Sequence, residues 1–178
     1  VTIFEKEYPQ RLKQIYDPPV VLFIKGEKKI LNRPAIGIVG CRLCTSYGSK
    51  NAKKFAYNLS KYHMNIVSGL ARGIDTYSHL GALKAGGTTI AVVGCGLDQV
   101  YPPENKGIFE QIIKTNGAIV SEYVVGTKPI GSNFPARNRI ISGISLRSIN
   151  YRSKKEKWQS YYSRIRNRAR KRCLCCSW

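Results

Sequence analysis

Glycines and arginines that directly follow short apolar runs are the residues of this chain best suited to chemistry. One run ends in GCR at residues 40–42, the next in SGLARGID at 68–75, and a third in GCGLD at 94–98. Glycine lets a ligand approach the backbone, and N–H groups at the start of a following helix bind phosphate. Arg42 and Arg72 would add charged forks to such a site. Each turn could also be a simple connection, but three turns with two arginines favour a phosphate-binding edge.

The segment NFPARNR at residues 133–139 places an aromatic side chain beside two arginines. Stacking combined with positive charge is typical of sites that bind single-stranded nucleic acid. The alternative is that Phe134 belongs to the core and that Arg137 and Arg139 are ordinary surface residues. The two nucleotide motifs GxGxxG and GxxxxGK[ST] are absent, because Gln99 breaks the first and the second does not occur. The pattern therefore leaves room for a nucleic-acid backbone.

Residues that could support catalysis or metal binding are few. His79 could act as a base with Asp75 as its partner, and Glu122 could be a general base, but no nucleophile accompanies them. Cys41 and Cys44 have the spacing of redox or zinc sites, and Cys173, Cys175 and Cys176 could supply further thiolates. No histidine stands at zinc-finger spacing from them, so small buried side chains are the simpler interpretation. We expect no enzyme activity, no metal and no cofactor.

The elements that would position these residues follow from the apolar pattern. Residues 35–39, 65–67, 89–93 and 118–120 are β-branched on both parities, as in strands buried on both faces. Helical patterns at residues 49–62, 75–85 and 105–115 separate them. This alternation predicts an α/β fold with a doubly wound, mainly parallel sheet, in which ligands bind at the carboxyl ends of the strands. A short strand is expected in VVLFIKG, after the turn at residues 17–19.

The net charge of +20 is divided unevenly along the 178 residues. Residues 1–146 hold 19 Lys+Arg and 9 Asp+Glu, whereas residues 147–178 hold 11 and 1, so each part contributes +10. A basic surplus favours polyanionic partners. No apolar run approaches the ~20 residues of a membrane span, and the first residues do not look like a signal peptide. We therefore expect a cytoplasmic protein.

Several long motifs, taken together, resemble the bacterial DNA-processing protein A family (DprA, also called Smf). They are the YPxxL and DPPxxLFxKG pattern at residues 8–26, IVGCR at 38–42, SGLARGID at 68–75, TIAVVGCGLDQVYPPEN at 89–105, SEY at 121–123 and FPARNRIISGIS at 134–145. The resemblance implies an extended Rossmann-like fold that binds single-stranded DNA and passes it to RecA in natural transformation. It also implies homodimers and no catalytic reaction.

The resemblance also implies which residues of this chain bind DNA. Cys41 departs from the family pattern, which has serine there, and a thiol donates less well to phosphate. The implied residues are Gly40, Cys41, Arg42, Ser68, Gly69, Arg72, Gly73, Lys128, Phe134, Arg137, Asn138 and Arg139.

The last 32 residues do not follow the family pattern, and they suggest a change of reading frame. Codons for residues 157–163 can be read one base later as SGSLITA, those for 172–178 as GVCAVPG, and those for 147–157 as GVLIIEAKKEK. We therefore expect residues 1–34 to be a lead-in segment, 35–146 the Rossmann-like core, and 147–178 a non-family basic tail. The tail should form none of the remaining parallel strands, which leaves the fold with an incomplete C-terminal part. A rival interpretation is a genuine basic tail that adds nucleic-acid affinity.

A second function class is a nucleotide-processing enzyme of the phosphoribohydrolase type, sometimes called lysine-decarboxylase-like. Enzymes of that related type need a PGGxGTxxE loop. The sequence does not contain one, so DNA binding is the favoured interpretation.

Overall fold

The computed structural model describes residues 1–151 and 173–176. Helices are α1 (Ser46–Lys61), α2 (Ile74–Lys84), α3 (Lys106–Lys114) and α4 (Asn133–Ile144), with short 3₁₀ turns at Leu12–Gln14, Lys28–Asn32 and Pro103–Asn105. Strands are β1 (Phe23–Gly26), β2 (Ala35–Gly40), β3 (Asn65–Ser68), β4 (Thr89–Val92), β5 (Ala118–Ser121), β6 (Arg147–Tyr151) and β7 (Cys173–Cys176). Within these ranges, no helix has the length and apolar character needed to cross a membrane.

The described strands form one sheet in the order β1-β5-β4-β3-β2-β6-β7. All neighbouring pairs are parallel except β1 and β5, which are antiparallel. The chain moves outward from β2 to β5 and then returns through α4 to β6, on the other side of β2. This reversal of direction is the mark of a doubly wound sheet. The predicted fold class is confirmed.

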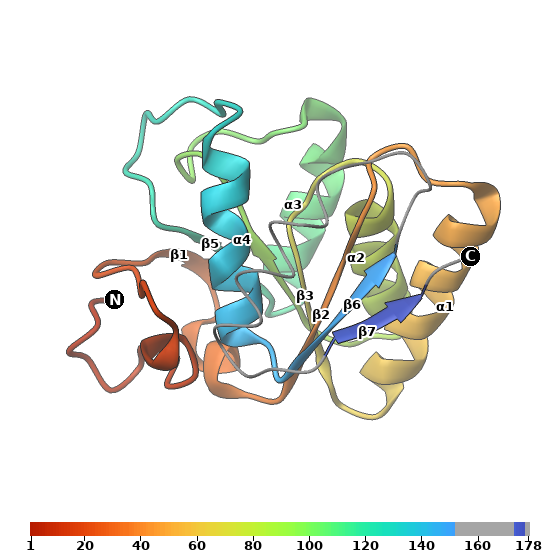
Figure 1. The fold of residues 1–178 in the computed structure, drawn as a ribbon, viewed down its shortest axis with the longest axis horizontal. Helices are drawn as coiled ribbons and strands as arrows, with labels where there is room; N and C mark the ends of the chain where they lie inside the picture. The colour runs from red at the N-terminus through yellow and green to blue at the C-terminus, as the bar shows by residue number, and fades with distance from the viewer. Residues whose placement is uncertain (152–172, 177–178) are drawn as a thin grey trace.

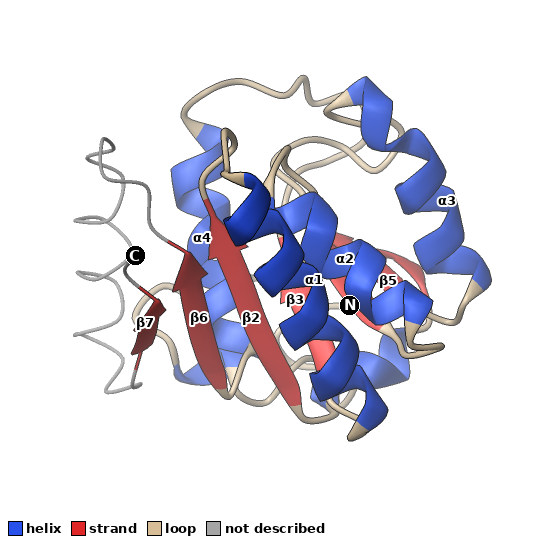
Figure 2. Cartoon of the chain, turned by 90° about the vertical axis from the view of Figure 1, so that its right-hand side faces the viewer, coloured by secondary structure: helices blue, strands red, loops and turns tan. Residues whose placement is uncertain are grey.

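Helices cover both faces of the sheet. Figure 1 shows α4 in front of the sheet, and Figure 2, turned by 90°, shows α1 and α2 on the opposite face. On the α4 side, Ile140, Ile141 and Ile144 pack against strand residues such as Val67 and Val92. On the other side, α1 and α2 share one apolar cluster with β2 and β6, and α3 shares another with β4 and β5. Burial on both faces explains the apolar runs of the inner strands.

The four predicted inner strands and the three predicted helices are confirmed, with ends shifted by a few residues. Helix α4 is the helix that the sequence pattern did not predict. Proline is tolerated in the first turn of a helix, where its missing N–H has no partner to lose, and Pro135 occupies that turn. The basic segment at residues 133–139 is therefore the start of a helix whose later turns enter the core.

Residues 1–34 belong to the same core as the strands that follow. Tyr8, Leu12, Leu22, Ile30 and Leu31 are almost fully buried in the cluster beneath α4. The Tyr8 hydroxyl donates a hydrogen bond to the Pro19 carbonyl at 2.6 Å. The short strand expected in VVLFIKG is β1, which pairs with the outer edge of β5. The lead-in segment is thus an integral part of the sheet and its packing.

The expectation that residues 147–178 form no strand of the sheet is wrong for the residues that the structure describes there. Strand β6 pairs with β2 from Ile36↔Arg147 to Gly40↔Tyr151, and β7 pairs with β6. Ile149 and Tyr151 join the apolar cluster of α1 and α2. Ser148 is small enough to be buried beside Gly37, where a side chain on the glycine would come within 3.1 Å of the serine hydroxyl. A strand with polar residues therefore fits because small groups face the crowded side. The rest of the expected basic tail lies outside the described residues.

Candidate nucleic-acid interface

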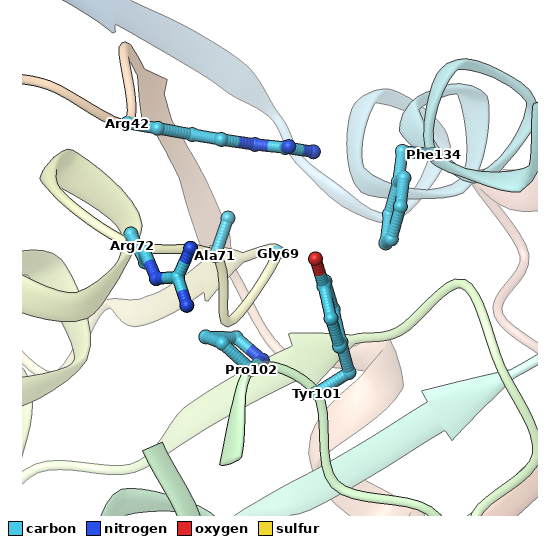
Figure 3. A pocket seen from close by; sticks show the side chains of 7 residues that line it. All are labelled: Arg42, Gly69, Ala71, Arg72, Tyr101, Pro102 and Phe134. Atoms are coloured by element: carbon cyan, nitrogen blue, oxygen red, sulfur yellow. The ribbon is translucent and has the colours of Figure 1, made fainter. Parts of the chain in front are cut away.

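The loops that follow β2, β3, β4 and β5 meet the start of α4 at one side of the sheet, which we call the carboxyl edge. A small pocket lies there, with a volume of about 20 Å³, enough for roughly one water molecule. Ligands of doubly wound sheets bind at this place. Because the pocket is so small, a larger ligand would contact the exposed side chains around it. The lining residues, shown in Figure 3, are Arg42, Gly69, Ala71, Arg72, Tyr101, Pro102 and Phe134.

A cation and two aromatic rings converge on this pocket. The Arg42 guanidinium carbon lies 5.1 Å from the centre of the Phe134 ring. The Tyr101 and Phe134 ring centres are 5.6 Å apart with an angle of 29° between their planes. Figure 3 shows the Arg42 side chain extended across the pocket toward Phe134. Arg42 is exposed and the rings are partly exposed, so the cluster offers both charge and a stacking surface.

The loop after β3 has a backbone that only certain residues allow. Gly73 has φ +74°, and a Cβ there would lie 2.4 Å from the Cys41 carbonyl oxygen. Leu70 also has positive φ, 57°, and its carbonyl accepts a hydrogen bond from Asn105 Nδ2 at 2.8 Å. A positive φ is uncommon for leucine and persists only where the surroundings enforce it. The loop is therefore held in one shape beside the pocket.

Arg137 supports this loop from beneath. It is 4% exposed, and its Nη1 donates to the carbonyls of Gly69, at 2.7 Å, and Val92. A Cβ on Gly69 would lie 2.5 Å from both terminal Arg137 nitrogens and 2.6 Å from Asp75 Oδ2. Asp75 accepts the Gly69 N–H at 3.1 Å. Burial raises the pKa of Asp75 to about 6, although the nearby Arg137 charge acts in the opposite direction. Arg137 thus supports the loop from within the core, and its predicted contact with DNA phosphate stays a prediction.

Arg139 is also bound within the protein. Its Nη1 and Nη2 donate to the two carboxylate oxygens of Glu122 at 2.7 and 2.6 Å. Its Nε donates to Asp17 Oδ2 at 3.0 Å and to the Asp17 carbonyl at 2.9 Å. The side chain is 15% exposed. Arg139 therefore connects α4 with the end of β5 and with the N-terminal segment, and its predicted contact with DNA stays a prediction.

Arg72 lies at the surface but has a carboxylate partner. Its Nε donates to Glu104 Oε1, and both side chains are about half exposed. The hydrogen bond from Arg72 lowers the pKa of Glu104 below its usual value. Exposed pairs of this kind contribute little stability. Arg72 can therefore exchange Glu104 for another anion at small cost, such as a phosphate.

The remaining predicted residues occupy two kinds of position. Ser68 is buried and its hydroxyl donates to the Ile38 carbonyl at 2.6 Å, so it supports the sheet instead of facing a ligand. Lys128 is exposed on the loop between β5 and α4, outside the pocket, and Asn138 is partly exposed on α4. Gly40 is the last residue of β2 and pairs with Tyr151, and Cys41 follows it in the turn before Arg42, where the Cys41 carbonyl accepts the Ile74 N–H at 3.3 Å.

The side chains considered for catalysis are not arranged for it. His79 is fully buried, its Nδ1 lies 2.8 Å from Thr89 Oγ1, and burial lowers its pKa to about 3. Glu122 is held by Arg139. Cys41 and Cys44 are not joined in a disulfide, and among the described residues no group of three or more His, Cys, Asp or Glu is placed to hold a metal.

Tyr101 and Pro102 are the site residues that the sequence analysis did not select. They follow the third glycine-rich turn, within the motif at residues 89–105. An aromatic residue before prolines, shortly after the end of a parallel strand, is a signal for this position. Tyr101 was not predicted to lie at the site because the predicted phosphate contacts in the strand-end loops rested on glycine and arginine alone.

Known proteins share both the sequence and the fold of this chain. The sequence profile of the family described as DNA recombination-mediator protein A matches residues 1–157, which includes β6. DNA processing protein DprA of Streptococcus pneumoniae is 46% identical over 143 residues, which cover 80% of this chain and 50% of that protein. Protein Smf of Synechocystis is 48% identical over 145 residues, which cover 79% and 36%.

Solved structures of DprA proteins have the same fold as this chain. The structure of DprA from Streptococcus pneumoniae has a TM-score of 0.89 at 38% identity, and covers 98% of this chain and 61% of that one. DprA from Helicobacter pylori, whose structure was solved to explain its binding of single-stranded DNA, has a TM-score of 0.85 at 31% identity, covering 96% and 78%. A molybdenum cofactor carrier from Chlamydomonas reinhardtii, at 17% identity and TM-score 0.57, shares the fold alone.

The chain spans about half or less of the length of these curated relatives. The profile match nevertheless covers most of the chain and includes every strand and helix up to β6. The chain therefore belongs to the DNA recombination-mediator protein A family, the DprA/Smf proteins of DNA processing.

Proposed function

We propose that this chain binds single-stranded DNA at the carboxyl edge and acts in DNA processing by binding instead of catalysis. The observation that carries the proposal is the cluster of Arg42, Phe134 and Tyr101. An accessible guanidinium and adjoining rings fit a strand whose bases are unstacked, because phosphates meet the cation and bases meet the rings. The glycine-rich loops beside it would bring backbone N–H groups to the same strand.

The known binding of single-stranded DNA by the Helicobacter pylori relative supports this proposal. The family resemblance extends it further. We propose that the protein protects incoming DNA, helps to load RecA in natural transformation and recombination, and resides in the cytoplasm. The buried His79 and the engaged Glu122 argue against the nucleotide-processing alternative, because neither side chain can reach a substrate as a base.

The test is a binding measurement with fluorescent oligonucleotides. The full chain should bind single-stranded DNA more tightly than duplex DNA of the same length, and Tyr101→Leu should weaken single-strand binding about tenfold if one base stacks on the ring. Equal or tighter binding to duplex DNA would overturn the proposal. Hydrolysis of a nucleoside monophosphate by the same preparation would favour the enzyme alternative.

A further inference from the structure

Helix α1 begins a few residues after Arg42 and has an unusual exposed surface. No Asp or Glu occurs between Glu27 and Asp75, a stretch that contains nine Lys+Arg. The helix itself has no acidic residue. Its exposed side chains include three lysines and three aromatic residues, counting Tyr62 at its C-terminal cap. We call this surface the basic-aromatic face of α1; its residues are Tyr47, Lys50, Lys54, Phe55, Lys61 and Tyr62.

The basic-aromatic face lies away from the side of α1 that packs on the core, and Lys61 Nζ lies 5.6 Å from the centre of the Tyr57 ring. Helix α1 is held to the core by Ala52 and Ala56, both fully buried. It lies close against α2, since a Cβ on Gly81 would come within 2.3 Å of the Lys53 carbonyl oxygen. Figure 2 shows the two helices side by side in front of the sheet. The basic-aromatic face points the other way, and Tyr47, Phe55 and Tyr62 are 55%, 46% and 81% exposed.

The spacing of these side chains along α1 fits an extended, negatively charged nucleic-acid strand. Tyr47, Lys50, Lys54 and Lys61 recur three, four and seven residues apart, and thus lie in one row along the helix. Phe55 and Tyr62, seven residues apart, form a neighbouring row. The 16 residues of α1 span roughly 24 Å at ~1.5 Å per residue. That length accommodates roughly seven nucleotides at the ~3.4 Å spacing of a stacked strand, and fewer in a stretched one.

We propose that single-stranded DNA leaving the carboxyl edge continues along the basic-aromatic face of α1, where Lys50, Lys54 and Lys61 contact phosphates and the three aromatic rings stack on bases. This inference rests on the proposed function. Two observations favour DNA as the ligand of the basic-aromatic face. Helix α1 begins at Ser46, four residues after the exposed Arg42, and the charged residues of the face are all cationic, which complements a polyanion. Three lysines share the face with the three aromatic residues, so the face lacks the wide apolar stripe through which a helix docks on another protein.

The experiment compares oligothymidylates of about 6 and about 20 nucleotides, lengths chosen because single-strand sites span ~4–16 nucleotides per domain. The shorter one can occupy the carboxyl edge alone, and the longer one reaches α1. Wild type should bind the longer one more tightly per molecule. A triple variant, Lys50→Gln with Lys54→Gln and Lys61→Gln, should lose about tenfold affinity for the longer oligonucleotide, keep its affinity for the shorter one, and show a salt slope smaller by about two.

A matched control removes the same charge elsewhere. Lys84, Lys106 and Lys114 are exposed on α2 and α3, and their triple glutamine variant should bind both lengths almost as wild type does. A double variant, Phe55→Ser with Tyr62→Ser, should weaken binding of the longer oligonucleotide only. Equal behaviour of the two triple variants would overturn the inference, as would an equal loss on both lengths. If wild type bound neither oligonucleotide, the proposed function itself would fail, which is a separate outcome.

Discussion

The arginines of the carboxyl edge fall into two groups that differ in what surrounds them. Arg42 and Arg72, the rim arginines, follow the ends of β2 and β3 and are exposed. Arg137 and Arg139, the inner arginines, come from α4 and bind carbonyls and carboxylates of the protein. The segment with the more obvious nucleic-acid pattern is thus the one that holds the fold together. A guanidinium presents five donors in a fixed fork, so it can organise several loops as readily as it can bind phosphate.

The largest effect is expected from Arg137→Ala. This change removes the donors to the Gly69 and Val92 carbonyls and leaves Asp75 without a nearby cation. Losing one partner from a buried charged network costs about 3–5 kcal/mol of unfolding free energy. Urea unfolding measures it, with Arg42→Ala as the control that should leave stability unchanged. An Arg137→Ala protein of normal stability and weakened DNA binding would reverse the assignment of the two groups.

The second effect concerns the pH dependence of stability near the inner arginines. Burial lowers the pKa of His79 to about 3, so the unfolded chain takes up a proton first and stability falls as the pH drops below about 6.5. Burial raises the pKa of Asp75 to about 6, so the folded chain holds the proton more tightly and stability rises as the pH drops from 6 to 4. The two contributions oppose each other, and the histidine has the larger shift.

Replacing His79 should therefore change the sign of the pH effect. Wild type should lose a little stability between pH 7 and pH 5, whereas His79→Gln should gain about 1 kcal/mol over the same interval from Asp75 alone. Thermal unfolding at several pH values measures this difference. His63→Gln, at the exposed second histidine, serves as the control and should behave like wild type. If stability depended on pH in the same way in all three proteins, the two buried groups would not titrate as expected.

Arg42→Ala tests the role of the rim arginines. It should weaken single-stranded DNA binding about tenfold, because both a phosphate contact and the cation over Phe134 are lost, with no change in unfolding free energy. The effect should not depend on base sequence, since phosphate contacts carry little sequence information. Arg33→Ala removes the same charge at the opposite end of β2 and should have little influence. Equal losses from both changes would mean that only net charge matters.

The smallest effect is expected from Glu104→Gln. Glu104 accepts a hydrogen bond from the Arg72 guanidinium, so on the proposed function its replacement should raise the affinity for single-stranded DNA by about two- to threefold at low salt. The gain should disappear in the double variant with Arg72→Ala, because the carboxylate then has no cation to release. A gain of the same size in that background would show general repulsion between Glu104 and DNA.

Local sequence patterns predicted the inner strands and the carboxyl edge of the sheet. β-Branched runs such as residues 35–39 indicated buried strands, and the glycine-rich turns indicated the carboxyl edge, where Arg42 lines the pocket. The partners of long side chains could not be predicted in this way, because Asp17 and Glu122 reach Arg139 only through the fold. Tyr101 meets Phe134 for the same reason. Strand β6 was missed because the analysis required apolar residues on both faces, whereas Ser148 is buried by virtue of its size.

The change of reading frame near residue 147 stays a prediction about the gene. Strand β6 and the profile match to residue 157 show that the family pattern extends beyond the expected boundary at residue 146. The coding DNA tests the idea directly: restoring one base should yield a GVLIIEA-like strand and an AVPG-like ending. If no single-base correction produces both, the residues from 147 onward are the native sequence of this protein.

The hydrogen bonds from Arg139 to Asp17 join residues that are 122 positions apart, and β1 pairs with β5 almost a hundred residues later. Contacts between distant parts of a chain slow folding, because a long loop must close before they form. During synthesis, the first 34 residues therefore emerge long before their binding surface exists. Their apolar side chains, Tyr8 and Leu12 among them, stay accessible to chaperones and proteases until α4 has been made. Residues 1–34 are thus among the last parts of the core to become protected.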